Sequence, residues 1–529
     1  MPDLLVDTPK KEAPAFRHHE VARSVGRNTF FGILSNLVQI GSRLVMVPVV
    51  ISHLGLGGYG IWSVVMATAG YMRFGTAGIK SAFQKYVAEA TGTGDYETAS
   101  KLLSTGNLLM LGISLVALIP MGIFSQQLAK AGGVPPDFLP AAAHSIRLLA
   151  AIMVMANWGA AYDAIVMGGH RIDLVRTFNM ITLTGEAVAI ITLLHFGNGL
   201  FAMACVMAAS ELVNLACCFV ASRRILPQIH VVPRFFTPGM FRELLRFAFS
   251  YQLVGILEVL YGMILPVTVL KFFGTEISGV YAVALRLSSA AQMGLDALMQ
   301  PILSSGTMIF ASGSIAKMSQ FVRKCFKLTT ALSLAPLGFV GAFGVLLVEV
   351  WTGQSDAEFR SALIWTCVSA LFAGISRVQL ILYRAAGNAL HDNLRQGFRL
   401  AALVATGAAA PYIGFHGVLV GLAAAEAIGV VYMFFALSAS LEWFHTRDLT
   451  SDSLRGLAAV ALVVATGYAA STIPVPGNLS EREMMLMRLC FICLGCAATL
   501  WPAATITKVV SPDEWSALLK LLPWKKAKA

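Results

Sequence analysis

Four arginines lie inside long apolar segments of the sequence: Arg43, Arg73, Arg286 and Arg377. A charge at the centre of a bilayer costs at least about 2.5–3.5 kcal/mol, so such a residue usually faces protein or a water-filled cavity. A guanidinium group stays charged and binds phosphate oxygens through paired hydrogen bonds. The four arginines are therefore candidate contacts for an anionic cargo that carries phosphate. The alternatives are that each pairs with a carboxylate or a helix C-terminus, and that Arg73 extends to the nearby membrane surface.

Acidic and aromatic residues accompany these arginines. Glu258 and Asp296 flank Arg286 in the chain and are candidates either for binding a coupling proton or sodium ion or for acting as counter-ions. Tyr261, close to Glu258, is a candidate for stacking on a sugar, although aromatic residues in spans more often form interfacial belts. Four further acids fall within apolar segments and have the same two interpretations: Asp163, Glu186, Glu211 and Glu426.

The composition indicates which elements must position these side chains. The 529 residues are 57% hydrophobic and 13% charged, with a mean hydropathy of +0.72. Soluble domains carry about 25% charged residues. The apolar residues form blocks of about 20, the length of a membrane-spanning helix. The sequence predicts an all-α polytopic membrane protein with about fourteen spans, at 28–52, 59–80, 103–125, 142–167, 176–196, 199–222, 247–272, 277–303, 326–350, 360–386, 396–414, 416–440, 454–474 and 486–506.

The lysines and arginines alternate between the two sides of these spans. Of the 39, we assign 29 to the termini and alternate loops, including Arg395 and Arg399, six to the opposite side and four to the spans. Because cytoplasmic loops are enriched in Lys and Arg, both termini are predicted to be cytoplasmic. The same asymmetry explains the net charge of +11. We therefore expect no nucleic-acid partner, since no recognition motif accompanies the charge.

The sequence contains an internal repeat of six spans. Residues 48–65 and 266–284 share a pattern of Pro, Gly and an aromatic residue, and residues 168–176 resemble 387–395 at nearly the same offset, 218 and 219. An even number of spans per repeat predicts two parallel lobes that alternate access to a central cavity. The predicted domains are a cytoplasmic segment 1–27, an N-lobe 28–222, a basic linker 223–246, a C-lobe 247–440, two extra helices 454–506 and an amphipathic cytoplasmic tail 507–529.

Several short motifs carry a family resemblance over residues 27–110. They are Arg27-Asn28, Pro48, Leu54-Gly55, Tyr59-Gly60-Ile61-Trp62, Gly70-Tyr71, Lys85-Tyr86-Val87-Ala88-Glu89, Gly94-Asp95 and Lys101. The chain resembles bacterial polysaccharide flippases of the Wzx, O-antigen transporter type, in the multidrug/oligosaccharidyl-lipid/polysaccharide exporter superfamily.

The resemblance implies translocation of an undecaprenyl-diphosphate-linked oligosaccharide across the bacterial inner membrane, for O-antigen (lipopolysaccharide), capsule or exopolysaccharide synthesis. Membrane lipids, a polysaccharide polymerase and chain-length proteins are the implied partners. Three alternatives remain: a cation-coupled multidrug exporter of the same superfamily, a polytopic polymerase or ligase, and a peptidoglycan-precursor flippase.

The motifs of common cofactors and catalytic centres are missing from the sequence. No Walker A lysine follows a glycine, no HExxH occurs, and no long loop could form a soluble catalytic domain. Cys490, Cys493 and Cys496 have the spacing CxxCxxC but lie in an apolar segment, so we interpret them as core or lipid-facing thiols. The sequence therefore predicts a secondary transporter without a cofactor or metal, and not an enzyme.

Overall fold

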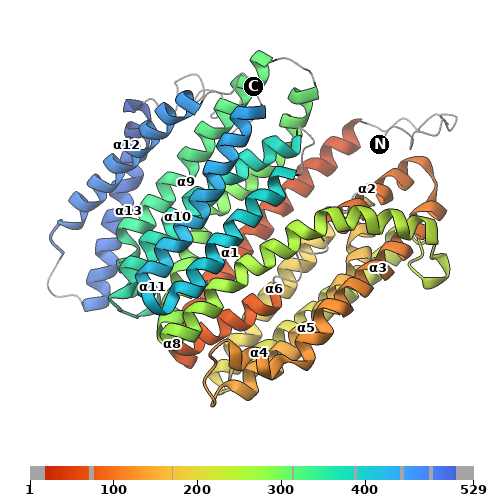
Figure 1. Ribbon diagram of the computed structural model, residues 1–529, viewed down its shortest axis with the longest axis horizontal. Helices are drawn as coiled ribbons and strands as arrows, with labels where there is room; N and C mark the ends of the chain where they lie inside the picture. The colour runs from red at the N-terminus through yellow and green to blue at the C-terminus, as the bar shows by residue number, and fades with distance from the viewer. Residues whose placement is uncertain are drawn as a thin grey trace. The chain divides into compact units, whose positions relative to one another are not determined.

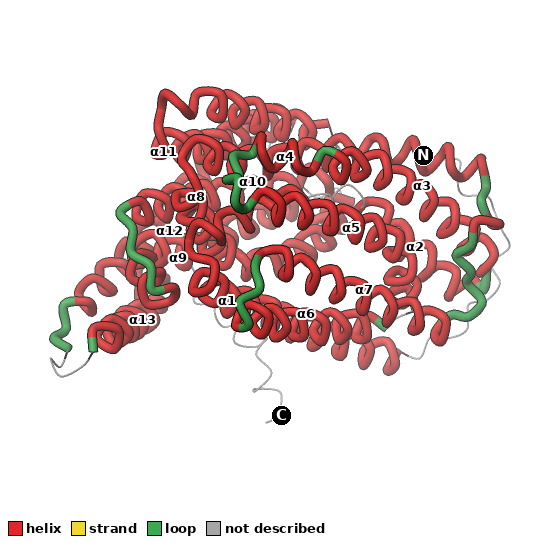
Figure 2. Tube along the Cα trace, turned by 90° about the horizontal axis from the view of Figure 1, so that it is seen from below, coloured by secondary structure: helices red, strands yellow, loops and turns green. Residues whose placement is uncertain are grey.

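The computed structural model describes residues 18–70, 77–169, 171–311, 315–385, 390–440, 446–475 and 480–507. Within these ranges every helix or strand assignment is helical, which confirms the all-α prediction (Figures 1 and 2). The elements are α1 (His18–Gly70), α2 (Ala77–Thr93), α3 (Tyr96–Ile123), α4 (Ser125–Ala131), α5 (Leu139–Gly168), α6 (Ile172–His195), α7 (Leu200–Ile225), the short 3₁₀ helix η2 (Pro233–Phe235), α8 (Pro238–Ala311), α9 (Ile315–Thr352), α10 (Glu358–Ala385), α11 (Leu390–Ser440), α12 (Thr446–Ser471) and α13 (Glu481–Ile506).

Ten helical stretches among the described residues are long and apolar enough to cross a membrane. Three of them contain a kink at a glycine: Gly55 (φ 73°, ψ 169°) in α1, Gly274 (φ 85°, ψ −179°) in α8 and Gly414 (φ 68°, ψ 179°) in α11. Only glycine adopts this backbone conformation without strain. Divided at these glycines, and taken with the shorter apolar helix Arg455–Ser471, the stretches match the fourteen predicted spans. The chain is a multi-pass membrane protein.

At the N-terminal end the structure adds helix before the first predicted span, and the C-terminal end lies mostly outside the described residues. Helix α1 already begins at His18, ten residues before the predicted start of the first span. The predicted amphipathic tail, 507–529, lies beyond the described residues except for Thr507.

Local backbone features recur along the chain at the offset of the predicted repeat. The left-handed glycines Gly55 and Gly274 are 219 residues apart, Gly133 and Gly353 are 220 apart, and Gly197 and Gly414 are 217 apart. The helix starts repeat as well: α3 and α9 begin 219 residues apart, and so do α5 and α10. The repeat therefore extends from the sequence to the ends and kinks of the helices.

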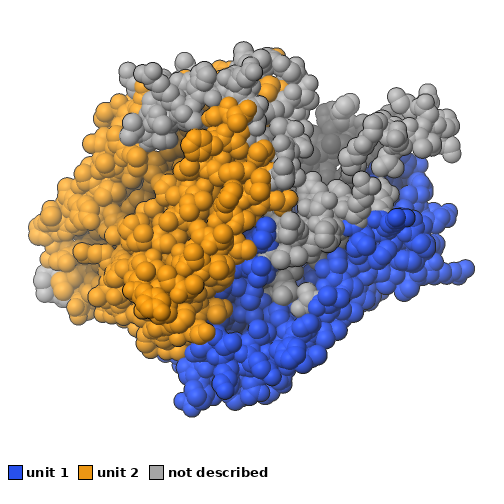
Figure 3. Space-filling view, viewed as in Figure 1, with its two compact units in different colours: residues 1–263 blue, residues 264–529 orange. Residues whose placement is uncertain are grey.

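The chain forms two compact units, residues 1–263 and 264–529, coloured in Figure 3. The division falls inside α8, later in the chain than the predicted linker 223–246. The first unit has a core between α2, α3, α5 and α7, in which Phe83, Leu103 and Ile165 are fully buried. A Cβ on Gly106 would lie 2.4 Å from the Phe83 ring, so this close approach of α2 and α3 requires glycine.

In the second unit α12 and α13 pack on each other and on α9. Phe343 of α9, Val463 of α12 and Ile492 of α13 meet in a buried cluster. Cys496 is buried in the same cluster, whereas Cys490 and Cys493 are exposed on α13. Among the described residues no group of three potential metal ligands occurs.

The segment 226–237, between α7 and α8, is fixed to α3 by buried hydroxyl groups. The backbone N–H groups of His230 and Val232 donate to Ser100 Oγ and Ser104 Oγ, both at 3.0 Å. Ser104 Oγ in turn donates to the His230 carbonyl at 3.2 Å, and Thr237 N–H donates to Thr105 Oγ1 at 3.0 Å. Irregular backbone must satisfy its polar groups somewhere, and here α3 provides the partners.

Replacing Ser104 with Ala is expected to lower the free energy of unfolding by about 1–3 kcal/mol, because it leaves the Val232 N–H and the His230 C=O without these hydrogen-bond partners. Reversible unfolding in mixed detergent micelles would measure this change. Ser145→Ala is the matched control, since Ser145 is equally buried but bonds only within its own helix, to Ala141 O at 2.7 Å. Equal effects of the two substitutions would contradict a specific role of Ser104.

Candidate functional site

Arg286 lies near the middle of a membrane span in the second unit. It is 12 residues beyond Gly274, about 18 Å along a helix, which is slightly more than half the thickness of an apolar core of about 30 Å. Helix α8 packs on α10 on both sides of Arg286, because Thr366 Oγ1 donates to Ala284 O at 3.5 Å and Gln292 donates to Ala370 O. The Arg286 Nε is buried and has no hydrogen-bond partner among the described residues.

An unpaired guanidinium at this depth is unfavourable unless water or an anionic ligand solvates it. Arg286 is therefore the predicted cation whose surroundings best fit a binding role. In the sequence, Arg286 was identified by its position in an apolar span. The structure adds that its Nε has no hydrogen-bond partner among the described residues.

Arg43 lies at a comparable depth in the first unit, 12 residues before Gly55, and its side chain is exposed. Helix α1 runs beside α6, and the ring centroids of His53, two residues before the kink at Gly55, and His195, the last residue of α6, are 6.4 Å apart. This register places Glu186 of α6 at the level of Arg43. Arg43 and Glu186 both take part in interactions in the structure, so the register favours the counter-ion interpretation over an unpaired cation.

Arg377 has an acid at its own level as well. A Cβ on Gly374 of α10 would lie 3.3 Å from the Leu295 side chain of α8. The contacts between these two helices advance along both in the same sense, so the segments are parallel. Asp296 therefore lies at about the depth of Arg377, although its side chain is not among those described. Arg377 takes part in an interaction in the structure, so it is a weaker candidate than Arg286 for an open cation site.

The remaining predicted site residues are Arg73, Glu258 and Tyr261. Arg73 lies outside the described residues. Glu258 is exposed and Tyr261 half-buried on the first part of α8, one turn apart on a shared face. Tyr261 takes part in an interaction in the structure. Their roles in ion coupling and sugar stacking stay predictions.

The structure also contains a buried ionic cluster, formed by α10 and α11, that sequence reasoning missed. Arg399 pairs with Glu426, with 9% and 5% of their side chains exposed, and donates to Gln396 Oε1 at 2.5 Å. Arg395 donates to Ser376 Oγ at 2.7 Å and lies 3.5 Å from the Asp392 carboxylate.

The assignment of Arg395 and Arg399 to a loop was wrong, whereas their cytoplasmic side stays a prediction. Because α11 already begins at Leu390, both arginines are buried helix residues, 6% and 7% exposed. Glu426 could have revealed the error. An acid deep in an apolar span requires a buried cation as its partner, and Arg399 is that cation. The charges of the cluster pair with one another, Arg395 with Asp392 and Arg399 with Glu426, so it fits a structural role better than ligand binding.

Comparison with known proteins identifies the family. The polysaccharide biosynthesis protein family model (Polysacc_synt) matches residues 25–307, more than half of the chain. The chain belongs to this family. No curated protein sequence matches the chain significantly.

The fold of this polysaccharide biosynthesis protein is shared with solved transporters. The lipid II flippase MurJ, in an inward closed conformation, aligns with a TM-score of 0.65 and 13% identity, over 89% of this chain and 97% of MurJ. A multidrug resistance MATE family transporter of the MOP superfamily, inward-facing, aligns with a TM-score of 0.59 and 14% identity, over 79% and 98%. A MOP superfamily transporter from Pyrococcus furiosus, described as having a binding pocket of reversed polarity, aligns with a TM-score of 0.57 and 16% identity, over 79% and 96%. The chain therefore has the MurJ/MATE-like transporter fold, as the resemblance implied.

Proposed function

We propose that the protein is a flippase that moves an undecaprenyl-diphosphate-linked oligosaccharide repeat unit across the cytoplasmic membrane by alternating access of its two lobes. The product would feed the synthesis of O-antigen, capsule or exopolysaccharide. Family membership supports the polysaccharide pathway, and the transporter fold supports translocation. The observation that carries the choice of cargo is Arg286, a mid-membrane cation without a protein partner among the described residues.

The charge of this site weighs against the multidrug alternative. An unpaired arginine attracts a diphosphate and repels a cationic drug. A diphosphate must lose its hydration to cross the apolar layer, and a guanidinium at half-depth replaces part of that hydration. The excess of Lys and Arg on one side of the spans supports an inner-membrane location with both termini in the cytoplasm. A polymerase and chain-length proteins would then act on the product outside.

Depletion of the protein in the organism that encodes it tests this proposal. We expect surface polysaccharide to fall and lipid-linked repeat units to accumulate with their sugars on the cytoplasmic side. Lipid extraction before and after treating intact spheroplasts with a glycosidase would measure which side the sugars face. Normal polysaccharide together with increased sensitivity to cationic dyes such as ethidium would refute the proposal and favour the multidrug exporter.

A further inference from the structure

One arginine occurs at equivalent positions of the two repeats, as Arg176 and Arg395, but has different partners in each. Asp392, Arg395 and Ser376 of the second unit correspond, at an offset of 219, to Asp173, Arg176 and Asn157 of the first. In the second unit both neighbours hold the arginine, because Arg395 donates to Ser376 Oγ at 2.7 Å and lies 3.5 Å from Asp392. Arg395 is 6% exposed as a result.

In the first unit other side chains bind both of those neighbours. Arg171 binds the two carboxylate oxygens of Asp173, at 3.2 and 3.4 Å, where the second unit has Leu390 instead of an arginine. Asn157 donates to Ser114 Oγ at 2.9 Å. Arg176 therefore binds neither of these two residues. Its Nε is buried, and the guanidinium group has no hydrogen bond or ion pair among the described residues.

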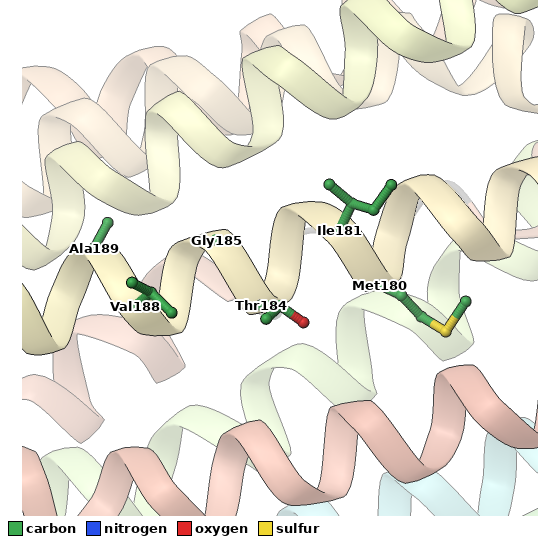
Figure 4. Close-up of a pocket in the computed structure, with 6 residues that line it drawn as sticks. All are labelled: Met180, Ile181, Thr184, Gly185, Val188 and Ala189. Atoms are coloured by element: carbon green, nitrogen blue, oxygen red, sulfur yellow. The ribbon is translucent and has the colours of Figure 1, made fainter.

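An apolar groove on α6 begins one turn beyond Arg176. Met180 stands four residues after Arg176 on the same face of the helix. Met180 and five further residues of α6 line the groove: Ile181, Thr184, Gly185, Val188 and Ala189 (Figure 4). Ile181 and Val188 are 64% and 59% exposed, and nothing lies within 4 Å of a Cβ built on Gly185. From Arg176 to Ala189 the helix extends about 20 Å, two-thirds of an apolar core.

We propose that Arg176 and the α6 groove form a lipid-binding site in which the guanidinium group binds a phosphoryl headgroup and the hydrocarbon chain lies along Met180–Ala189. An unpaired cation at one end of an apolar groove matches a lipid with an anionic head and a long tail in both charge and polarity. Undecaprenyl diphosphate and phosphatidylglycerol share this chemistry. If the lipid is undecaprenyl diphosphate, the site extends the proposed function and rests on it. Arg176 lies in the second turn of α6, at the end that the topology places on the cytoplasmic side, so such a lipid would be bound before translocation.

The test uses the full-length protein in phosphatidylcholine nanodiscs, with undecaprenyl diphosphate, phosphatidylglycerol and inorganic pyrophosphate as probes and native mass spectrometry as the readout. We expect Arg176→Gln to weaken binding of one or both lipids about tenfold, through the loss of one charged hydrogen bond. Arg171→Leu should weaken it equally, because it frees Asp173 to pair with Arg176 as Asp392 pairs with Arg395. Gly185→Leu should weaken lipid binding but leave pyrophosphate binding unchanged.

Two substitutions serve as controls and should change nothing. Arg360→Gln removes an exposed arginine of the other unit, and Gly112→Leu adds the same side chain at an exposed glycine of α3 with open space around it. The lipid whose binding depends on Arg176 is the occupant of the site. Unchanged binding of both lipids to Arg176→Gln would overturn the site and show an arginine that water alone solvates. Undecaprenyl diphosphate binding that survives in Arg176→Gln but is lost in Arg286→Gln would overturn the site while supporting the proposed function.

Discussion

Replacing Arg286 with Gln is expected to slow export of the lipid-linked cargo about 10- to 100-fold while leaving the protein folded in the membrane. The side chain is at half-depth, and its Nε has no partner among the described residues. If it binds the diphosphate during translocation, its loss removes a charged hydrogen bond worth about 1.5–3 kcal/mol at that step. Each 1.4 kcal/mol corresponds to a tenfold change in rate. Arg286→Lys should retain part of the activity, because it keeps the charge but loses the planar pair of donors.

The stability of the same variant separates a binding role from a structural one. Removing a half-buried charge whose Nε has no partner among the described residues should leave the unfolding temperature unchanged or raise it, since binding sites are often held at a cost in stability. Export would be measured as surface polysaccharide in depleted cells that express the variant, with Arg360→Gln as the exposed control. A lower unfolding temperature with normal export would show that Arg286 supports the fold and does not bind the cargo.

Much of the architecture could be predicted because the membrane restricts the fold. Apolar blocks of about 20 residues can only be helices, and the distribution of Lys and Arg counts and orients them. Even the close split near His416 was predicted from Pro411, Gly414 and Gly417, and Gly414 proves to be the residue that leaves the helical conformation. These features depend on local sequence, so one chain is enough to find them.

The partners of buried charges depend on which helices pack together, and local sequence contains little of that information. The sequence around Gly387-Asn388 indicates a loop that would include Arg395 and Arg399, yet α11 begins before both arginines and buries them. The same limit applies to the four arginines chosen from the sequence. The register of α1 with α6 and of α8 with α10 puts acids level with Arg43 and Arg377, and these acids are 143 and 81 residues away in the chain. Of the three candidate arginines that the structure describes, Arg286 is therefore the strongest candidate, and Arg73 stays a prediction outside the described residues.

Replacing Glu426 with Gln is expected to lower the free energy of unfolding by about 3–5 kcal/mol. Glu426 and Arg399 are both almost completely buried, so removing the carboxylate leaves a guanidinium without its counter-charge in an apolar interior. Chemical unfolding in mixed micelles would measure the loss. The exposed pair of Glu97 and Lys101, 2.7 Å apart with 70% and 41% of their side chains exposed, provides the matched control. Glu97→Gln should cost no more than about 1 kcal/mol, because water screens that pair.

The double variant Arg399→Met with Glu426→Leu distinguishes a structural role of the pair from a role in transport. Removing both charges at once deletes the desolvation cost of each along with their attraction, so stability should return to within about 1–2 kcal/mol of the original protein. If the pair only holds α11 together across the kink at Gly414, export should recover with stability. If export stays low in a stable double variant, the charges themselves take part in transport, and the ion-coupling interpretation of Glu426 is favoured over the counter-ion interpretation. A single variant as stable as the original protein would contradict the pairing on which this argument depends.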